Sequence, residues 1–168
     1  MKLDRTAIKK KLMERNIVEE SAPQLTSQLR KILADTMLFY FKSHSFHWNV
    51  EGANFNDYHA FLSTIYTQTF ANVDPIAEHI RMLGEYAPNS LQELISAASI
   101  SEVQSKPGSA REMFAILKSD NEKIIAGLKS GKDIANSTGV TDVANYLEEL
   151  ITAQRKLAWM LDSLLKGQ

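Results

Sequence analysis

The chain has 168 residues, a formal net charge of −1, 44% hydrophobic and 23% charged residues, and no cysteine. That composition is typical of one globular domain with a single core, and the near-neutral charge excludes a polycation that binds nucleic acid along its whole length. The missing cysteine excludes disulfides, thiolate metal ligands and a cysteine nucleophile.

The chain begins with a basic segment, residues 1–21, in which apolar residues at helical spacing predict a short helix over residues 4–19. Its basic side chains are Lys2, Arg5, Lys9, Lys10, Lys11 and Arg15. The segment has no apolar core, so no signal peptide is expected, and the most apolar run, residues 32–41, is too short to span a membrane. We therefore expect a cytoplasmic protein.

Residues 22–168 form the predicted domain, with helical periodicity throughout and weak strand signals. A first long helix is predicted over residues 22–48, because Pro23 suits an early helix position. The second is predicted over residues 56–83, ended by a glycine. Pro75 inside it should kink the helix or remove one backbone bond.

A long connection, residues 84–107, contains one short helical stretch at residues 90–99. A third long helix is predicted to begin near Ser109. The last, residues 141–166, has the clearest spacing of apolar residues by threes and fours. Four long helices with one long crossover between the second and third predict an all-α, ferritin-like four-helix bundle whose crossover carries a short helix.

Candidate metal ligands flank the loop between the first two helices. His44 and His47 precede it and His59 follows it, while Asp74 and Glu78 lie one helical turn apart further along the second helix. Imidazole and carboxylate ligands together suit Fe, Zn or Mn. The alternative is that these histidines are ordinary helix-end residues and that the two acids form a solvated face.

The spacing separates the four strongest candidates within one chain. His59 lies 15 residues before Asp74, roughly 22 Å along a helix at about 1.5 Å per residue, and His47 lies at the same end as His59. They could meet only if a second copy lay antiparallel across a two-fold axis. No histidine follows a glutamate by three residues, so a di-iron centre within one subunit is not expected.

Four stretches carry a resemblance to a known family: "KSHSFHWNVEGANFNDYH", "VDPIAEHIRMLG", "SLQELISAASI" and "LEELITAQRKLAWML". Over residues 22–166 the sequence resembles the Dps family, the mini-ferritins that protect DNA in starved bacteria. The resemblance implies a hollow shell of twelve subunits that oxidises Fe(II), typically with hydrogen peroxide, and stores the ferric mineral inside. It thereby implies protection against oxidative stress.

The resemblance also implies the site. The catalytic metal ligands are expected to be His47 and His59 from one subunit, with Asp74 and Glu78 from its two-fold partner. Ser63 stands where the family commonly has aspartate, and a serine hydroxyl is a poor ligand. We therefore expect one stronger and one weaker iron position. The alternative is a DNA-coating or structural particle with weakened ferroxidase activity, and a third reading is a plain four-helix domain that binds Zn²⁺.

Four further residues are interpreted through the family pattern. Trp48 is expected close to the metal site, with a core anchor as the alternative, and Trp159 is expected in the core. His79 replaces the usual arginine and is expected to be a surface or interface residue. His44 is not a family ligand.

Charged residues outside the site have two possible roles each. The resemblance implies an acidic iron-conducting pore near the start of the last helix, where Asn145 takes the matching position and Asp142, Glu148 and Glu149 are the nearby candidates. The alternative is a solvated acidic helix start favoured by the helix dipole. The basic side chains of residues 1–21 are candidates for sequence-independent DNA contacts, which twelve copies would make multivalent. Here the alternative is a solvated helix face packed on the shell.

Overall fold

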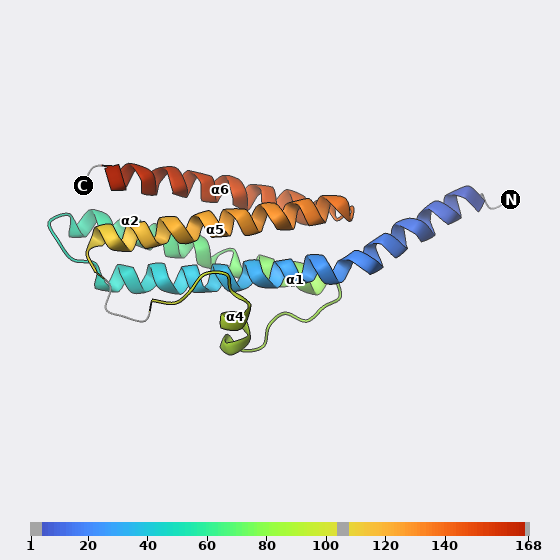
Figure 1. Ribbon diagram of the computed structural model, residues 1–168, viewed down its shortest axis with the longest axis horizontal. Helices are drawn as coiled ribbons and strands as arrows, with labels where there is room; N and C mark the ends of the chain where they lie inside the picture. The colour runs from blue at the N-terminus through green and yellow to red at the C-terminus, as the bar shows by residue number, and fades with distance from the viewer. Residues whose placement is uncertain (1–4, 104–107, 167–168) are drawn as a thin grey trace.

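The computed structural model describes the backbone of residues 5–103 and 108–166, and the side chains of residues 23–103 and 108–166. Within these ranges the chain is helical and contains no strand. The helices are α1 (Arg5–Asn49), α2 (Phe55–Phe70), α3 (Val73–Met82), α4 (Leu91–Ala97), α5 (Ala110–Ser137) and α6 (Thr141–Lys166) (Figure 1).

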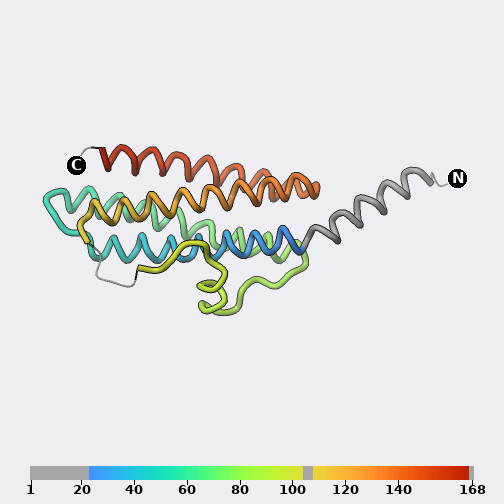
Figure 2. The backbone as a smooth tube through the Cα atoms, viewed as in Figure 1, coloured from blue at the N-terminus to red at the C-terminus, as the bar shows by residue number. Residues whose placement is uncertain are grey.

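Two helical hairpins lie side by side and form the bundle. One pairs α1 with α2 and α3, and the other pairs α5 with α6 (Figure 1). The crossover from α3 to α5 passes along the outside of the bundle and places α4 against α1 (Figure 2). With α2 and α3 counted as one interrupted helix, this is the expected ferritin-like four-helix bundle with a long crossover.

The interruption between α2 and α3 has a specific cause in Pro75. In an unbroken helix the proline ring would clash with the carbonyl of Ala71, four residues earlier, and the nitrogen could not donate to it. The chain turns at Ala71 and Asn72 instead, and Ile76 N donates to Asn72 O at 3.2 Å in the new helix. The predicted kink is confirmed as a complete break.

The start of α1 differs from the prediction. The helix begins at Arg5 rather than near residue 22, and it continues through Pro23. A proline inside a helix removes one backbone hydrogen bond, and here that loss does not end the helix. Leu25 and Leu29 follow within two turns and are fully buried, so packing holds the backbone helical directly after the proline. The division at residue 21 stays a prediction.

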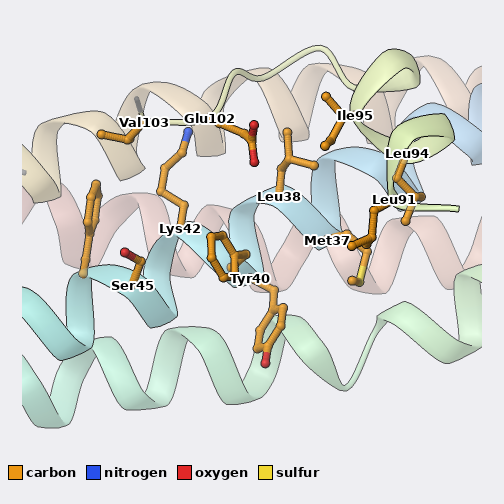
Figure 3. Close-up of a pocket in the computed structure, with 12 residues that line it drawn as sticks. Met37, Leu38, Tyr40, Lys42, Ser45, Leu91, Leu94, Ile95, Glu102 and Val103 are labelled. Atoms are coloured by element: carbon orange, nitrogen blue, oxygen red, sulfur yellow. The ribbon is translucent and has the colours of Figure 1, made fainter. Parts of the chain in front are cut away.

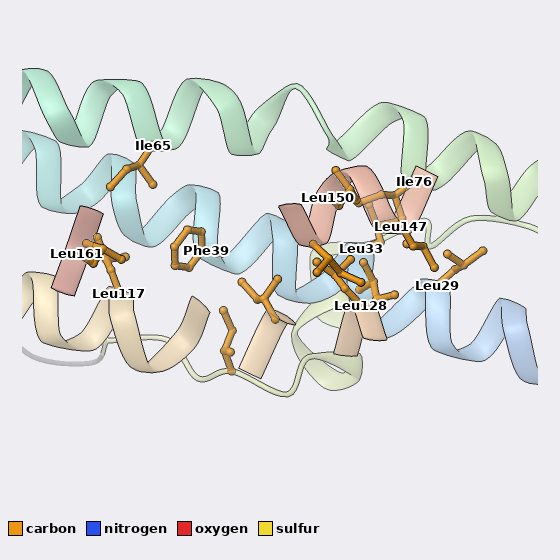
Figure 4. Close-up of a cluster of buried hydrophobic side chains, with 14 of the residues drawn as sticks. Leu29, Leu33, Phe39, Ile65, Ile76, Leu117, Leu128, Leu147, Leu150 and Leu161 are labelled. Carbon is orange, nitrogen blue, oxygen red and sulfur yellow. The ribbon is translucent and has the colours of Figure 1, made fainter. Parts of the chain in front are cut away.

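The core runs along the middle of the bundle and takes apolar side chains from every long helix (Figure 4). Phe39 from α1, Ile76 from α3, Leu117 from α5 and Leu147 from α6 are each fully buried. Burial of this apolar surface is the main stabilising contribution.

Two buried charges on α1 hold the crossover. Asp35 accepts hydrogen bonds from the Ser99 backbone N–H and hydroxyl, each at 2.6 Å. Lys42 forms an ion pair with Asp120 and donates to the Ser101 carbonyl at 2.6 Å. Burying a charge is costly unless it is compensated: Asp35 is compensated by hydrogen bonds, and Lys42 by both an ion pair and a hydrogen bond. The crossover therefore has a defined path over α1.

A cavity of about 530 Å³ lies between α1, α4 and the crossover (Figure 3). Its lining is mostly apolar and includes Leu38, Leu91 and Ile95. The lining contains no histidine, so the cavity is separate from the candidate metal ligands.

Candidate metal centre

The loop between α1 and α2 brings two histidines together. His47 lies in the last turn of α1 and His59 in the second turn of α2. The loop turns at Gly52, whose positive φ of 122° is a conformation that glycine adopts without strain. The two imidazole rings then stack, with their centroids 3.6 Å apart and an interplanar angle of 22°.

Reciprocal hydrogen bonds identify which nitrogen of each ring is the donor. His47 Nδ1 lies 2.8 Å from the His59 carbonyl oxygen, and His59 Nδ1 lies 2.8 Å from the His47 carbonyl oxygen. A carbonyl oxygen can only accept, so each Nδ1 is the donor, and a neutral ring in this arrangement has its lone pair on Nε2. This is the arrangement that orients a histidine as a metal ligand.

Other rings surround the pair. Tyr66 lies 5.2 Å from His47 between ring centroids, and His44 stacks on Tyr66 at 4.0 Å. Partial burial lowers the pKa of His44, and interaction with His47 lowers it further. Trp48 is 58% exposed, with its ring 4.4 Å from His44. Trp48 therefore lies beside His44 and is not a core residue of this chain, and its closeness to a metal site stays a prediction.

The two candidate carboxylates lie on a different helix. Asp74 is in the first turn of α3, where the helix dipole favours a negative charge, and Glu78 follows one turn later. Both side chains are exposed. Among the residues whose side chains are described, no group of three or more His, Asp or Glu could hold a metal ion. One chain therefore presents a histidine pair and an acidic pair separately, and a site shared between subunits stays a prediction.

One sequence interpretation is corrected: Trp159 is 66% exposed rather than buried, because it lies between the core positions of α6 and faces outward. His79 is half-buried against Tyr146 of α6, with ring centroids 4.9 Å apart, and its buried Nδ1 has no hydrogen-bond partner among the described residues. Its role as an interface residue stays a prediction. Burial raises the pKa of Tyr146 to about 12, and the charge of Glu149 contributes.

Comparison with known proteins decides the family. A ferritin-like domain model matches residues 26–167. The "DNA protection during starvation protein 2" of Bacillus anthracis is 31% identical over 142 residues, which cover 84% of this chain and 97% of the relative. The Brevibacillus brevis protein named "DNA protection during starvation protein" is 30% identical over 138 residues, 82% of this chain and 92% of the relative. The chain belongs to the Dps family.

A solved Dps structure agrees with the fold. The Dps protein of Vibrio cholerae, described as a member of the ferritin-like diiron-carboxylate superfamily, superposes with a TM-score of 0.83 at 27% identity. The match covers 87% of this chain and 91% of that one. The four-helix bundle and its crossover are therefore those of a Dps subunit.

Within this Dps fold, Ser63 takes the place of the expected aspartate. It lies one turn after His59 on α2, half-buried, and its hydroxyl donates to the Tyr66 hydroxyl at 3.4 Å. The sequence interpretation had not singled out Tyr66. Its position two turns after His59 would have indicated it, because residues seven apart share one helix face.

The structure describes the candidate pore residues but not the side chains of the candidate DNA-contact residues. Asp142 lies exposed in the first turn of α6, Glu149 is also exposed, and Glu148 pairs with Lys132 at 2.6 Å. Lys2 lies outside the described residues, as do the side chains of Arg5, Lys9, Lys10, Lys11 and Arg15.

Within the described ranges, no helix is both long and apolar enough to cross a membrane.

Proposed function

We propose that this Dps protein oxidises Fe(II) at sites shared across a two-fold subunit interface. His47 and His59 of one subunit and Asp74 and Glu78 of the other hold the iron. The observation that carries the proposal is the reciprocal pair of Nδ1–carbonyl hydrogen bonds, which leaves two Nε2 atoms with no acid nearby among the described side chains of the same chain. A second copy, reversed across a two-fold axis, can supply the missing carboxylates.

The ligand set suits the chemistry. Carboxylates add negative charge and thereby favour Fe(III) over Fe(II), while the neutral imidazoles bind either state. Two Fe(II) ions supply the two electrons that reduce one hydrogen peroxide to water, and no hydroxyl radical is released. Iron is the substrate here, and the oxidised product is stored as a ferric mineral. Zn²⁺ has the same ligand preferences and can substitute.

The proposal includes the assembly that the family implies, a cytoplasmic shell of twelve subunits. The shell keeps iron away from DNA and so protects it from oxidative damage, in line with the names of the two relatives. Asp142, Glu148 and Glu149 near the start of α6 are candidates for the pore that admits iron. The pairing of Glu148 with Lys132 leaves Asp142 and Glu149 as the stronger candidates.

Ser63 supports a second candidate function. Where a carboxylate is missing, the second iron position of each site is weakened, and the particle could serve mainly to coat DNA. Rates of Fe(II) oxidation with peroxide separate the two candidates. In a ferroxidase, His59→Ala removes most of the wild-type rate, whereas in a coating particle the two proteins oxidise iron equally slowly.

Mixing two inactive variants tests whether the site is shared. His59→Ala and Glu78→Ala subunits, unfolded and reassembled together, form mixed dimers in which one of the two sites has all its ligands. Random mixing makes half of the dimers mixed, so about a quarter of the wild-type rate should return. Mixed particles with no activity would contradict the proposal.

The matched control mixes His47→Ala with His59→Ala. Both changes affect the histidine half of the site, so no pairing of these subunits contains an intact site. The rate should stay at the level of either variant alone. The native mass of every particle is measured in parallel, so that a failure to assemble is not read as a failure of the chemistry.

A further inference from the structure

The first turn of α2 is anchored on its core-facing side, where it meets the second hairpin. Tyr58 directly precedes His59, is 8% exposed and belongs to the buried core. Its ring meets Phe114 of α5 edge to face, with centroids 5.2 Å apart and an interplanar angle of 71°. Phe114 is itself fully buried, so this contact joins the start of α2 to the core of the α5–α6 hairpin.

The loop before α2 is joined to the same tyrosine. Asn54 is the N-cap residue of α2, and its side chain makes no capping hydrogen bond with the described backbone. Asn54 Nδ2 donates instead to the Tyr58 hydroxyl oxygen at 3.2 Å. Asparagine is favoured at an N-cap because its side-chain oxygen accepts from a free backbone N–H, and that stabilisation is missing here. The side chain of Asn54 therefore holds the Tyr58 phenol rather than the helix end.

Tyr58 is also the core-facing residue of α2 nearest to the histidine pair. The other buried residues of this helix, Leu62, Ile65 and Thr69, lie one or more turns further from the loop. Neighbouring residues of a helix are fixed at about 100° to each other around its axis. The direction in which Tyr58 packs therefore sets the direction in which His59 points.

We propose that Tyr58 is a positioning residue for the histidine half of the metal site. The inference rests on the proposed function, since it concerns how His47 and His59 are held for iron. The contacts with Phe114 and Asn54 limit rotation of the first turn of α2. They thereby keep the His59 carbonyl and ring in place for the reciprocal Nδ1–carbonyl hydrogen bonds. Groups that orient a histidine in this way strengthen its binding to metal.

Solid-state nitrogen NMR of the assembled, metal-free protein tests the positioning without iron chemistry. A neutral histidine in water mostly carries its proton on Nε2, whereas the reciprocal hydrogen bonds need it on Nδ1. The two forms differ in their ring nitrogen shifts. At a pH that keeps the rings neutral, the wild type should show two Nδ1–H signals. His47→Ala and His59→Ala assign them, because each variant removes one ring.

Three variants decide the assignment. Tyr58→Leu keeps an apolar side chain but loses the ring and the hydroxyl, so Nε2–H signals should replace the two Nδ1–H signals. Phe114→Leu removes the other ring of the same contact and should have the same effect, which keeps the proposal testable if Tyr58→Leu does not assemble. Tyr58→Phe loses only the bond to Asn54 and should restore most of the Nδ1–H signal. Unchanged spectra in Tyr58→Leu and Phe114→Leu overturn the inference.

Ile65→Ala is the matched control for general loosening of the core. Ile65 is 2% exposed and lies on the buried face of α2 two turns after Tyr58. Its truncation also removes core packing, but at a distance from the loop. Urea unfolding should show a loss of stability in Ile65→Ala, while both Nδ1–H signals remain. If Ile65→Ala changes the histidine signals as Tyr58→Leu does, the inference is overturned.

Calorimetric titration with Zn²⁺ separates failure of this inference from failure of the proposed function. His47→Ala measures binding elsewhere on the particle. Zn²⁺ binding that the wild type shows beyond that background should be about 10–100-fold weaker in Tyr58→Leu, the usual effect of losing a group that orients a ligand. Equal affinities in these two proteins overturn the positioning role alone. Wild-type binding no stronger than that of His47→Ala overturns the shared site instead, and the NMR spectra then decide the role of Tyr58.

Discussion

At the scale of single residues, we expect Ser63 to weaken the second iron position of the proposed site. The Ser63→Asp variant adds a carboxylate one turn after His59 and should bring the two metal affinities of each site closer together. Anaerobic Fe(II) titration measures them, and the wild type should show two unequal affinities. Thr64→Asp is the matched control, because Thr64 is exposed beside Ser63 and should leave the affinities unequal. Two equally tight irons in the wild type would contradict this prediction.

Titration of the Tyr146 phenol makes the free energy of unfolding depend on pH in the alkaline range. Its pKa is about 12 in the folded chain, against an ordinary value of 10.0, because burial disfavours the phenolate. Between these values the unfolded chain has lost the proton and the folded chain has not, so the free energy of unfolding falls as pH rises. The half-buried position reduces the effect to about 1–2 kcal/mol.

Urea unfolding at pH values below 10.0 and above about 12 measures how much the free energy of unfolding falls. In Tyr146→Phe the part of the decrease that comes from this phenol should be absent, so the variant should lose less stability than the wild type. Tyr86→Phe removes an exposed phenol and should keep the wild-type dependence. Equal losses in all three proteins would show that Tyr146 titrates normally.

Where α5 crosses α1 and α6, the helices approach closely because Gly131 has no side chain. A Cβ at this position would lie 3.0 Å from both Ile32 Cδ1 and Leu147 Cδ1. Gly131→Val should therefore lower the free energy of unfolding by about 1–3 kcal/mol through overpacking. Thermal or urea unfolding measures the change.

Gly127, one turn earlier on the same helix, provides the matched control. A Cβ there would meet only Gln28 Nε2, at an ordinary contact distance of 3.7 Å. Gly127→Val should change stability by less than about 1 kcal/mol, because it gains helix propensity without a clash. If both variants lose the same stability, the close approach at Gly131 is not the cause.

At the scale of the helices, the sequence predicted a helix boundary correctly where a single residue sets it. Pro75 predicted the break between α2 and α3, since its clash lies within four residues of chain. Pro23 led to a wrong helix start, because its effect on the helix depends on residues outside its own turn. A proline is compatible with a helix start and with a helix interior, and packing on Leu25 and Leu29 settles the choice. That packing depends on partners distant in sequence.

For the assembled particle, the basic segment offers a test of DNA binding. Removal of residues 2–15 should abolish retardation of duplex DNA in a low-salt gel shift, and retardation by the full chain should weaken steeply as salt rises. Twelve copies would strengthen weak phosphate contacts. Replacing Lys9, Lys10 and Lys11 with Gln keeps the segment's length and should give intermediate binding. No retardation by the full chain would end the hypothesis.

The sequence alone determined the all-α bundle, the long crossover, the Dps resemblance and the four expected ligands, because periodicity and motif spacing are local properties. Tertiary structure decided that His47 and His59 stack with each Nδ1 donating to a carbonyl, that His79 is half-buried against Tyr146, and that Trp159 faces outward. These outcomes depend on which surfaces of α1, α2, α3 and α6 meet. Contacts between helices distant in sequence set those surfaces, and spacing within one helix does not encode them.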